Sequence, residues 1–154
     1  QMGAEVWGAD PLGVPAGLRA VALDDALPHV DALTVHCSLS GTSEGLLHAG
    51  RLARLPAHAV LVNTARGRVL DVRAAVEAVR AGRLRGLAVD VFPEEPWPAL
   101  AAGVPGVWFT PHSAGASHDL GERVAAEVRT TLAAWAAGAP LPHPVRPSAS
   151  EETA

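Results

Sequence analysis

The sequence contains no lysine, so all 12 of its basic residues are arginines. With 16 acidic residues the net charge is -4, which argues against a surface for nucleic acid or anionic membrane. The single cysteine, Cys37, excludes an internal disulfide and fits a reducing compartment. No apolar run reaches membrane-spanning length, and no leader pattern opens the sequence. We therefore expect a soluble, cytoplasmic protein.

The composition is that of a folded protein, because 49% of the residues are hydrophobic and 18% are charged. A length of 154 residues suits one domain with its own core and is short for two. We predict that residues 1–145 form this domain. Residues 146–154, which are rich in serine and acidic side chains, are expected to form a flexible C-terminal tail.

Short apolar segments alternate with segments of helical spacing along most of the chain. Strands are predicted at residues 5–10, 32–36, 59–63, 87–91 and 107–110, and helices at 23–27, 46–55, 72–81 and 117–137. Asp71 and Ser117 are the predicted N-caps of the last two helices. Such alternation predicts an α/β fold, a doubly wound parallel sheet that helices cover on both faces.

Chemically versatile side chains follow three of the predicted strands. Arg66 follows the third, Asp90 and Glu95 the fourth, and His112 the fifth. Because ligands bind beyond the carboxyl ends of the strands in such sheets, these groups can converge. Arginine can grip a carboxylate with two hydrogen bonds, and histidine can transfer a proton near neutral pH. The set suits the reduction of a 2-oxo acid.

Each of these residues also has a purely structural interpretation. Arg66 could cap carbonyls, Asp90 could satisfy backbone amides, and Glu94 and Glu95 could be solvated loop charges. His112 could be an ordinary loop histidine. The histidines show no metal-ligand spacing on a common helix face, so no metal site is expected.

Asp10 ends the first predicted strand and is followed by proline. An acid at this place in a dinucleotide-binding unit accepts hydrogen bonds from the adenine ribose and disfavours a 2′-phosphate, so it favours NAD over NADP. The alternative is that Asp10 only starts a turn.

Several segments together resemble one enzyme family. They are residues 3–11, 31–47, 60–71 (VLVNTARGRVLD), 82–96 (GRLRGLAVDVFPEEP) and 110–115 (TPHSAG). In this order and spacing they resemble the nucleotide-binding domain of the D-isomer-specific 2-hydroxyacid dehydrogenases. The resemblance implies a Rossmann-like fold, NAD as cofactor, a small 2-hydroxy or 2-oxo acid as substrate, and a homodimer for the full-length enzyme.

The resemblance also implies roles for individual residues. The catalytic residues that it implies are Arg66, Glu95 and His112. Arg66 matches the arginine that binds substrate and takes part in catalysis, His112 the catalytic acid/base, and Glu95 the acid that favours the protonated imidazole. The cofactor-binding positions that the resemblance implies are Asp10, Cys37, Ser38, Thr64, Ala65, Arg66, Asp90, His112 and Gly115.

The sequence departs from the family in three places. Cys37-Ser38 stands where many members have an apolar residue and proline, and Pro93-Glu94 where members often have Glu-Pro. Only nine residues precede Asp10, so we expect the glycine-rich turn, the first strand and the substrate domain to be missing. The sequence is thus interpreted as a C-terminal fragment of a D-2-hydroxyacid dehydrogenase. The alternatives are a non-catalytic NAD-sensing protein like the family's co-repressors, or an inactive remnant.

Overall fold

The computed structural model of the protein describes residues 3–94 and 103–144. The chain divides into two compact units, residues 1–114 and 115–154. The predicted tail at residues 146–154 lies outside the described residues.

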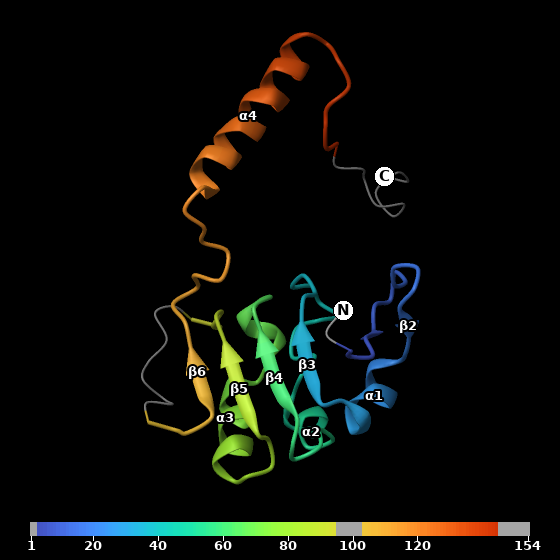
Figure 1. The fold of residues 1–154 in the computed structure, drawn as a ribbon, viewed down its shortest axis with the longest axis vertical. Coiled ribbons are helices and arrows are strands. Elements are labelled where there is room, and N and C mark those ends of the chain that lie inside the picture. The colour runs from blue at the N-terminus through green and yellow to red at the C-terminus, as the bar shows by residue number, and fades with distance from the viewer. Residues whose placement is uncertain (1–2, 95–102, 145–154) are drawn as a thin grey trace. The chain divides into compact units, whose positions relative to one another are not determined.

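The first unit is built from short strands that alternate with helices, as the sequence predicted (Figure 1). Its strands are β1 (Trp7–Gly8), β2 (Arg19–Ala20), β3 (Ala32–Val35), β4 (Val60–Asn63), β5 (Gly86–Val89) and β6 (Val107–Phe109). Its helices are α1 (Leu23–Ala26), η1 (Leu27–His29), α2 (Ala49–Leu52), η2 (Gly67–Val69) and α3 (Val72–Arg80). The second unit contains α4 (Leu120–Ala136).

The strands form two parallel sheets in the described part of the chain. One has the order β3-β4-β5-β6, and the other pairs β1 with β2. Consecutive strands of the larger sheet are therefore neighbours in space, so the predicted parallel α/β fold is confirmed. The sequence did not predict β2, whose two residues are exposed and carry no apolar pattern.

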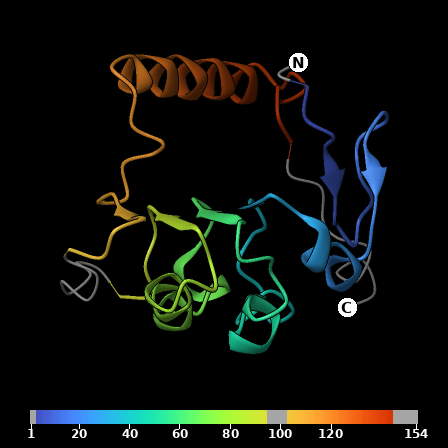
Figure 2. The same ribbon diagram turned by 60° about the horizontal axis from the view of Figure 1, so that its bottom comes forward.

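The core of the first unit lies between the larger sheet and its helices. Leu61, Leu87 and Val89 are buried from the strands, and Val72 and Val76 from α3. Figure 2 shows α2 and α3 on the same side of the sheet. Burial alternates along β4 and β5, so the side chains on one face of these strands are more deeply buried than those on the other. Apolar runs identify a buried strand, but they do not say which of its faces receives a helix.

Two predicted helix starts were wrong. The segment predicted as helical from residue 46 becomes α2 only at Ala49, because Leu47 forms a parallel bridge with Leu70 and donates its amide to the carbonyl of Val69. The predicted cap Ser117 does not cap α4. Its hydroxyl donates instead to Asp119, which occupies the N-cap position.

The predicted cap of α3 is confirmed. The Asp71 carboxylate accepts a hydrogen bond of 3.0 Å from the amide of Ala74, one of the amides at the helix start that have no carbonyl partner within the helix. Gly82 follows the last turn with φ of +67°, the left-handed conformation in which helices commonly end.

Replacing Asp71 with alanine is expected to lower the free energy of unfolding by about 1 kcal/mol, because the amide of Ala74 loses its acceptor. Urea denaturation followed by circular dichroism measures the change. Asp71→Ser, which retains a capping oxygen, should stay within a few tenths of a kcal/mol of the wild type. Equal losses in both variants would contradict the capping role.

Helix α4 has no buried residue within its own unit. Its apolar side chains Leu120, Val124, Val128 and Leu132 are each at least 42% exposed. Nowhere in residues 3–94 and 103–144 is there a helix both long enough and apolar enough to cross a membrane.

Candidate functional site

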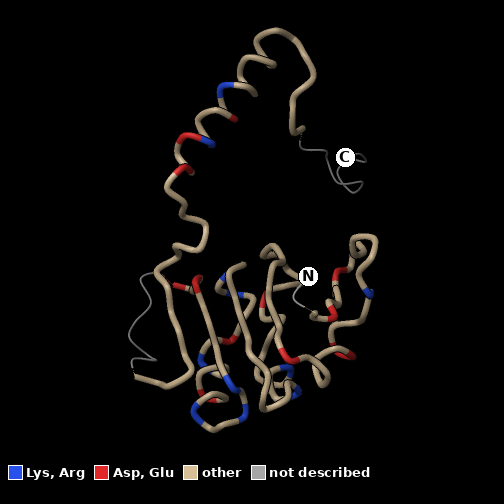
Figure 3. The backbone as a smooth tube through the Cα atoms, viewed as in Figure 1, with Lys and Arg blue, Asp and Glu red and all other residues tan. Residues whose placement is uncertain are grey.

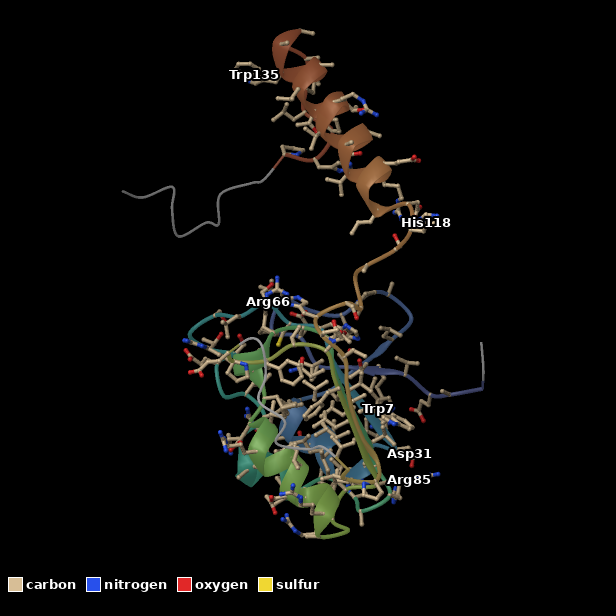
Figure 4. All side chains as sticks on the ribbon, turned by 90° about the vertical axis from the view of Figure 1, so that its left-hand side faces the viewer. Trp7, Asp31, Arg66, Arg85, His118 and Trp135 are labelled. Atoms are coloured by element: carbon tan, nitrogen blue, oxygen red, sulfur yellow. The ribbon has the colours of Figure 1, made fainter. Side chains whose placement is uncertain are left out.

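Three of the predicted site residues follow neighbouring strands of the larger sheet. Arg66 follows β4, Asp90 follows β5, and His112 follows β6. Because β4, β5 and β6 are parallel and adjacent, their carboxyl ends meet at one edge of the sheet. Figure 4 shows Arg66 at this edge, and Asp31 and Arg85, which precede strands, at the opposite one.

A group of basic residues lies at the edge of the sheet where the strands begin. Figure 3 shows a group of basic residues where α3 ends and the chain turns into β5, at the edge where the strands begin. These are Arg80, Arg83 and Arg85.

The backbone of the Arg66 loop is buried while the arginine itself is exposed. Ala65 and Gly67 are buried on either side of it. One guanidinium nitrogen, Nη1, donates to the carbonyl oxygen of Ala65 at 2.7 Å. A guanidinium carries five N–H donors in a planar fork, so this bond leaves donors that can hold a carboxylate.

Gly67 is required by close packing between the ends of β4 and β5. A Cβ atom added at Gly67 would lie 2.0 Å from the carbonyl carbon of Phe92 and 2.4 Å from the nitrogen of Pro93. The Phe92 ring also meets that of Phe109 edge to face, with centroids 5.2 Å apart. The segment after β4 thus packs against the segment after β5, which in turn packs against the end of β6.

Asp90 is a buried carboxylate that holds the loop after β6. It is 4% exposed. Its Oδ1 accepts from the Thr110 hydroxyl and the Ser113 amide, and its Oδ2 accepts from the Ala114 amide. Burial raises the pKa of the carboxyl, but these three hydrogen bonds and the charge of His112 lower it by more, so the net shift of the Asp90 pKa is downward. Asp90 is therefore an anion at neutral pH.

His112 lies within the loop that Asp90 holds. Its φ is +52°, a left-handed conformation that non-glycine residues seldom adopt, and its amide donates to the carbonyl of Thr110 at 3.0 Å. Such strained residues cluster at functional sites, where the surrounding structure enforces them. Here the bonds from Asp90 to residues on both sides of His112 supply that enforcement.

The first predicted strand is shorter than expected, so Asp10 lies two residues after the end of β1, and it is exposed. Its Oδ1 accepts from the amide of Leu12 at 2.8 Å, and its carbonyl from the amide of Gly13. The turn that was the structural alternative for Asp10 is therefore present. The turn fixes the carboxylate just after the strand end and leaves it open to solvent.

The remaining predicted site residues have varied surroundings. Cys37 is half-buried against the core, and Ser38 is exposed and accepts a hydrogen bond from Ser43 through its carbonyl oxygen. Thr64 is exposed. Gly115 is the first residue of the second unit.

Glu95, the predicted partner of His112, lies outside the described residues. Its neighbour Glu94 is described and exposed. Among the residues that the structure describes, no group of His, Cys, Asp and Glu is arranged to hold a metal ion.

Two residues that shape the site were not predicted from the sequence. The side chain of Asn63 makes hydrogen bonds to the backbone of Ala65 and Arg66, and the hydroxyl of Thr110 donates a hydrogen bond to Asp90. A signal for Asn63 was present: it is a polar residue at an inward-facing position of an otherwise apolar strand. No comparable pattern distinguishes Thr110.

Comparison with known proteins gives consistent results. A family model described as the NAD binding domain of D-isomer specific 2-hydroxyacid dehydrogenases matches residues 1–114. The (S)-sulfolactate dehydrogenase of Chromohalobacter salexigens is 37% identical over 132 residues, which cover 80% of this chain and 42% of that protein.

Solved structures agree in fold. A D-isomer specific 2-hydroxyacid dehydrogenase family protein from Klebsiella pneumoniae matches with a TM-score of 0.84 and 32% identity over 94% of this chain and 48% of that one. An NADPH-dependent glyoxylate/hydroxypyruvate reductase from Sinorhizobium meliloti, in complex with NADP and sulfate, matches with a TM-score of 0.80 and 29% identity over 94% of this chain and 48% of that one. The chain thus spans somewhat less than half the length of each of these relatives.

Proposed function

Because the chain belongs to the D-isomer specific 2-hydroxyacid dehydrogenase family, we propose that it supplies the cofactor-binding and catalytic part of an oxidoreductase. The reaction is the interconversion of a D-2-hydroxy acid and the corresponding 2-oxo acid, with NAD as the cofactor. We assign residues 1–145 to the cofactor-binding domain, and place the enzyme in the cytoplasm as a homodimer.

The observation that carries this proposal is the arrangement at the carboxyl edge of the sheet. An exposed arginine and a conformationally strained histidine follow strands on either side of β5, and the buried Asp90 fixes the histidine loop. A cation that binds carboxylate and a group that transfers protons are what reduction of a 2-oxo acid requires.

In the proposed mechanism, Arg66 binds the substrate carboxylate through two parallel hydrogen bonds and polarises the neighbouring carbonyl. A bound nicotinamide cofactor would supply the hydride for C2. His112 donates the proton that converts the carbonyl oxygen to a hydroxyl, and takes it back in the reverse direction. Glu95 would favour the protonated imidazole. Asp90 keeps the loop of His112 in place.

The residues of the first unit fit a nicotinamide dinucleotide. Asp10 is held just after the end of β1 by its bond to Leu12, and its exposed carboxylate can accept hydrogen bonds from a ribose diol. A 2′-phosphate at the same place would be repelled by this charge, which supports NAD rather than NADP. Thr64 and Ala65 directly follow β4, and we propose that their backbone lies against the nicotinamide half of the cofactor.

A fluorescence titration of this chain with NADH and NADPH tests the cofactor assignment. We expect saturable NADH binding that Asp10→Ala weakens about tenfold, because a charged hydrogen-bond acceptor is lost. We also expect NADH to bind more tightly than NADPH to the wild type, and this preference to shrink in the variant.

The matched control is Asp31→Ala. Asp31 is also an exposed carboxylate, but it lies at the edge where the strands begin and pairs with His58 (Figure 4). Its removal should leave the affinity for NADH unchanged. An Asp10→Ala variant with wild-type affinity, or equal affinities for NADH and NADPH, would contradict the assignment of NAD.

A further inference from the structure

Asn63 is a completely buried polar residue at the last position of β4. Its exposed fraction is 0%, and its side chain points to the same face of the strand as that of Leu61. Its backbone carbonyl accepts from the amide of Asp90, so the residue is also fixed to the neighbouring strand β5. The backbone of Asn63 is therefore held in place independently of the hydrogen bonds of its side chain.

Both ends of the Asn63 amide bind the loop that carries Arg66. Oδ1 accepts from the amide of Ala65 at 3.0 Å, and Nδ2 donates to the carbonyl oxygen of Arg66 at 3.1 Å. A buried amide without hydrogen-bond partners is costly, so the loop and the side chain stabilise each other in one conformation. The backbone is thus fixed immediately before and at Arg66.

The other side of the same loop is closed by Gly67. Its missing side chain lets the Phe92–Pro93 peptide pack directly on the backbone, at a distance where any Cβ would overlap. Arg66 therefore lies between a hydrogen-bonded anchor on its N-terminal side and a tight packing contact on its C-terminal side.

We propose that Asn63 is a positioning residue for Arg66, which sets the direction in which the guanidinium meets the carboxylate of the 2-oxo acid. The inference rests on the function proposed above for Arg66. Two features make the guanidinium sensitive to the loop. First, the Cα atom of Arg66 is part of the segment that Asn63 fixes. Second, Nη1 of Arg66 donates to the carbonyl oxygen of Ala65, and the amide of Ala65 donates to Asn63. A shift of the loop moves both attachment points together.

Steady-state kinetics of the intact protein that contains this chain test the proposal. Asn63→Leu removes both hydrogen bonds while keeping the branched shape and the number of heavy atoms of the side chain, and Gly67→Ala displaces the same loop by steric overlap. In each variant we expect kcat/KM for the 2-oxo acid to fall about 100-fold, because small displacements of a substrate-holding group are that costly. The KM for the 2-oxo acid should rise, and it should rise by a larger factor than the KM for NADH, which also depends on the backbone of Ala65 in this loop.

Leu61→Ala is the matched control. Leu61 is also 0% exposed, lies on the same face of the same strand, and makes no bond to the loop. All variants are assayed well below their thermal midpoints. A purely structural defect lowers the fraction of active enzyme, so it reduces the apparent kcat and leaves both KM values unchanged. Leu61→Ala should show this pattern.

Arg66→Ala separates failure of this inference from failure of the proposed function. A severe loss in Arg66→Ala, together with an Asn63→Leu variant that resembles Leu61→Ala, would overturn the positioning role alone. Wild-type kinetics in Arg66→Ala would overturn the function proposed for Arg66, and the positioning role with it. A raised KM for the 2-oxo acid in both Asn63→Leu and Gly67→Ala would support the proposal.

Discussion

Replacement of His112 by asparagine is expected to lower the kcat for 2-oxo acid reduction by about 10²- to 10⁴-fold, the range by which a positioned acid/base accelerates proton transfer. Asparagine suits this test because it tolerates the left-handed conformation better than most residues, and φ at position 112 is +52°. The loss should therefore reflect the missing imidazole rather than a distorted loop. Oxidation of NADH by the intact protein, followed by absorbance, gives the rate.

Two controls bear on this prediction. His58→Asn removes an imidazole that pairs with Asp31 at the opposite edge of the sheet, and it should leave kcat unchanged. His112→Gly should be more stable than His112→Ala by about 1 kcal/mol, because glycine adopts positive φ without a steric penalty. A turnover number within tenfold of the wild type in His112→Asn would exclude His112 as the proton donor.

Replacing Asp90 with asparagine is expected to lower the free energy of unfolding by about 2–4 kcal/mol at neutral pH. The carboxylate accepts three hydrogen bonds from the loop after β6. In the variant, the new NH₂ group would face a backbone amide or a hydroxyl donor, so at least one buried group loses its partner. Chemical denaturation measures the difference.

The effect of Asp90 on stability should depend on pH with a definite sign. The pKa of Asp90 is lowered in the folded protein, so its contribution is fully present above the pKa of an unfolded aspartate, about 3.9. The contribution declines as the pH falls below that value and is lost below the folded-state pKa. The stability difference between the wild type and Asp90→Asn should therefore be constant near neutral pH and shrink in acid.

Asp25→Asn serves as the reference for this experiment, since Asp25 is an exposed aspartate of α1. Its substitution should have little effect on stability at any pH. If the difference between the wild type and Asp90→Asn stayed constant into strong acid, the ionised carboxylate would not be the stabilising species.

Much of the fold was predictable because the relevant signals are local. The apolar runs that become β4 and β5 are short and bounded by turn residues, and both strands lie within a residue or two of their predicted bounds. Asp71 was identified as a cap because capping depends on residues within one helical turn. The start of α2 was not predictable in this way, since it depends on the bridge between Leu47 and Leu70, which are distant in sequence.

The sequence by itself determined which chemical groups stand at the strand ends, because strand periodicity and the segments around Arg66, Asp90 and His112 are properties of neighbouring residues. It also determined that these groups share one edge, because successive parallel strands tend to be neighbours. Only the tertiary structure decided how they are held there. They are held by hydrogen bonds and packing contacts, which act only over short distances. These are the two hydrogen bonds of Asn63, the contact of Gly67 with Phe92 and Pro93, and the hydrogen bonds of Asp90 to the His112 loop. Some of these join residues twenty or more positions apart, and such forces act only after the chain has folded.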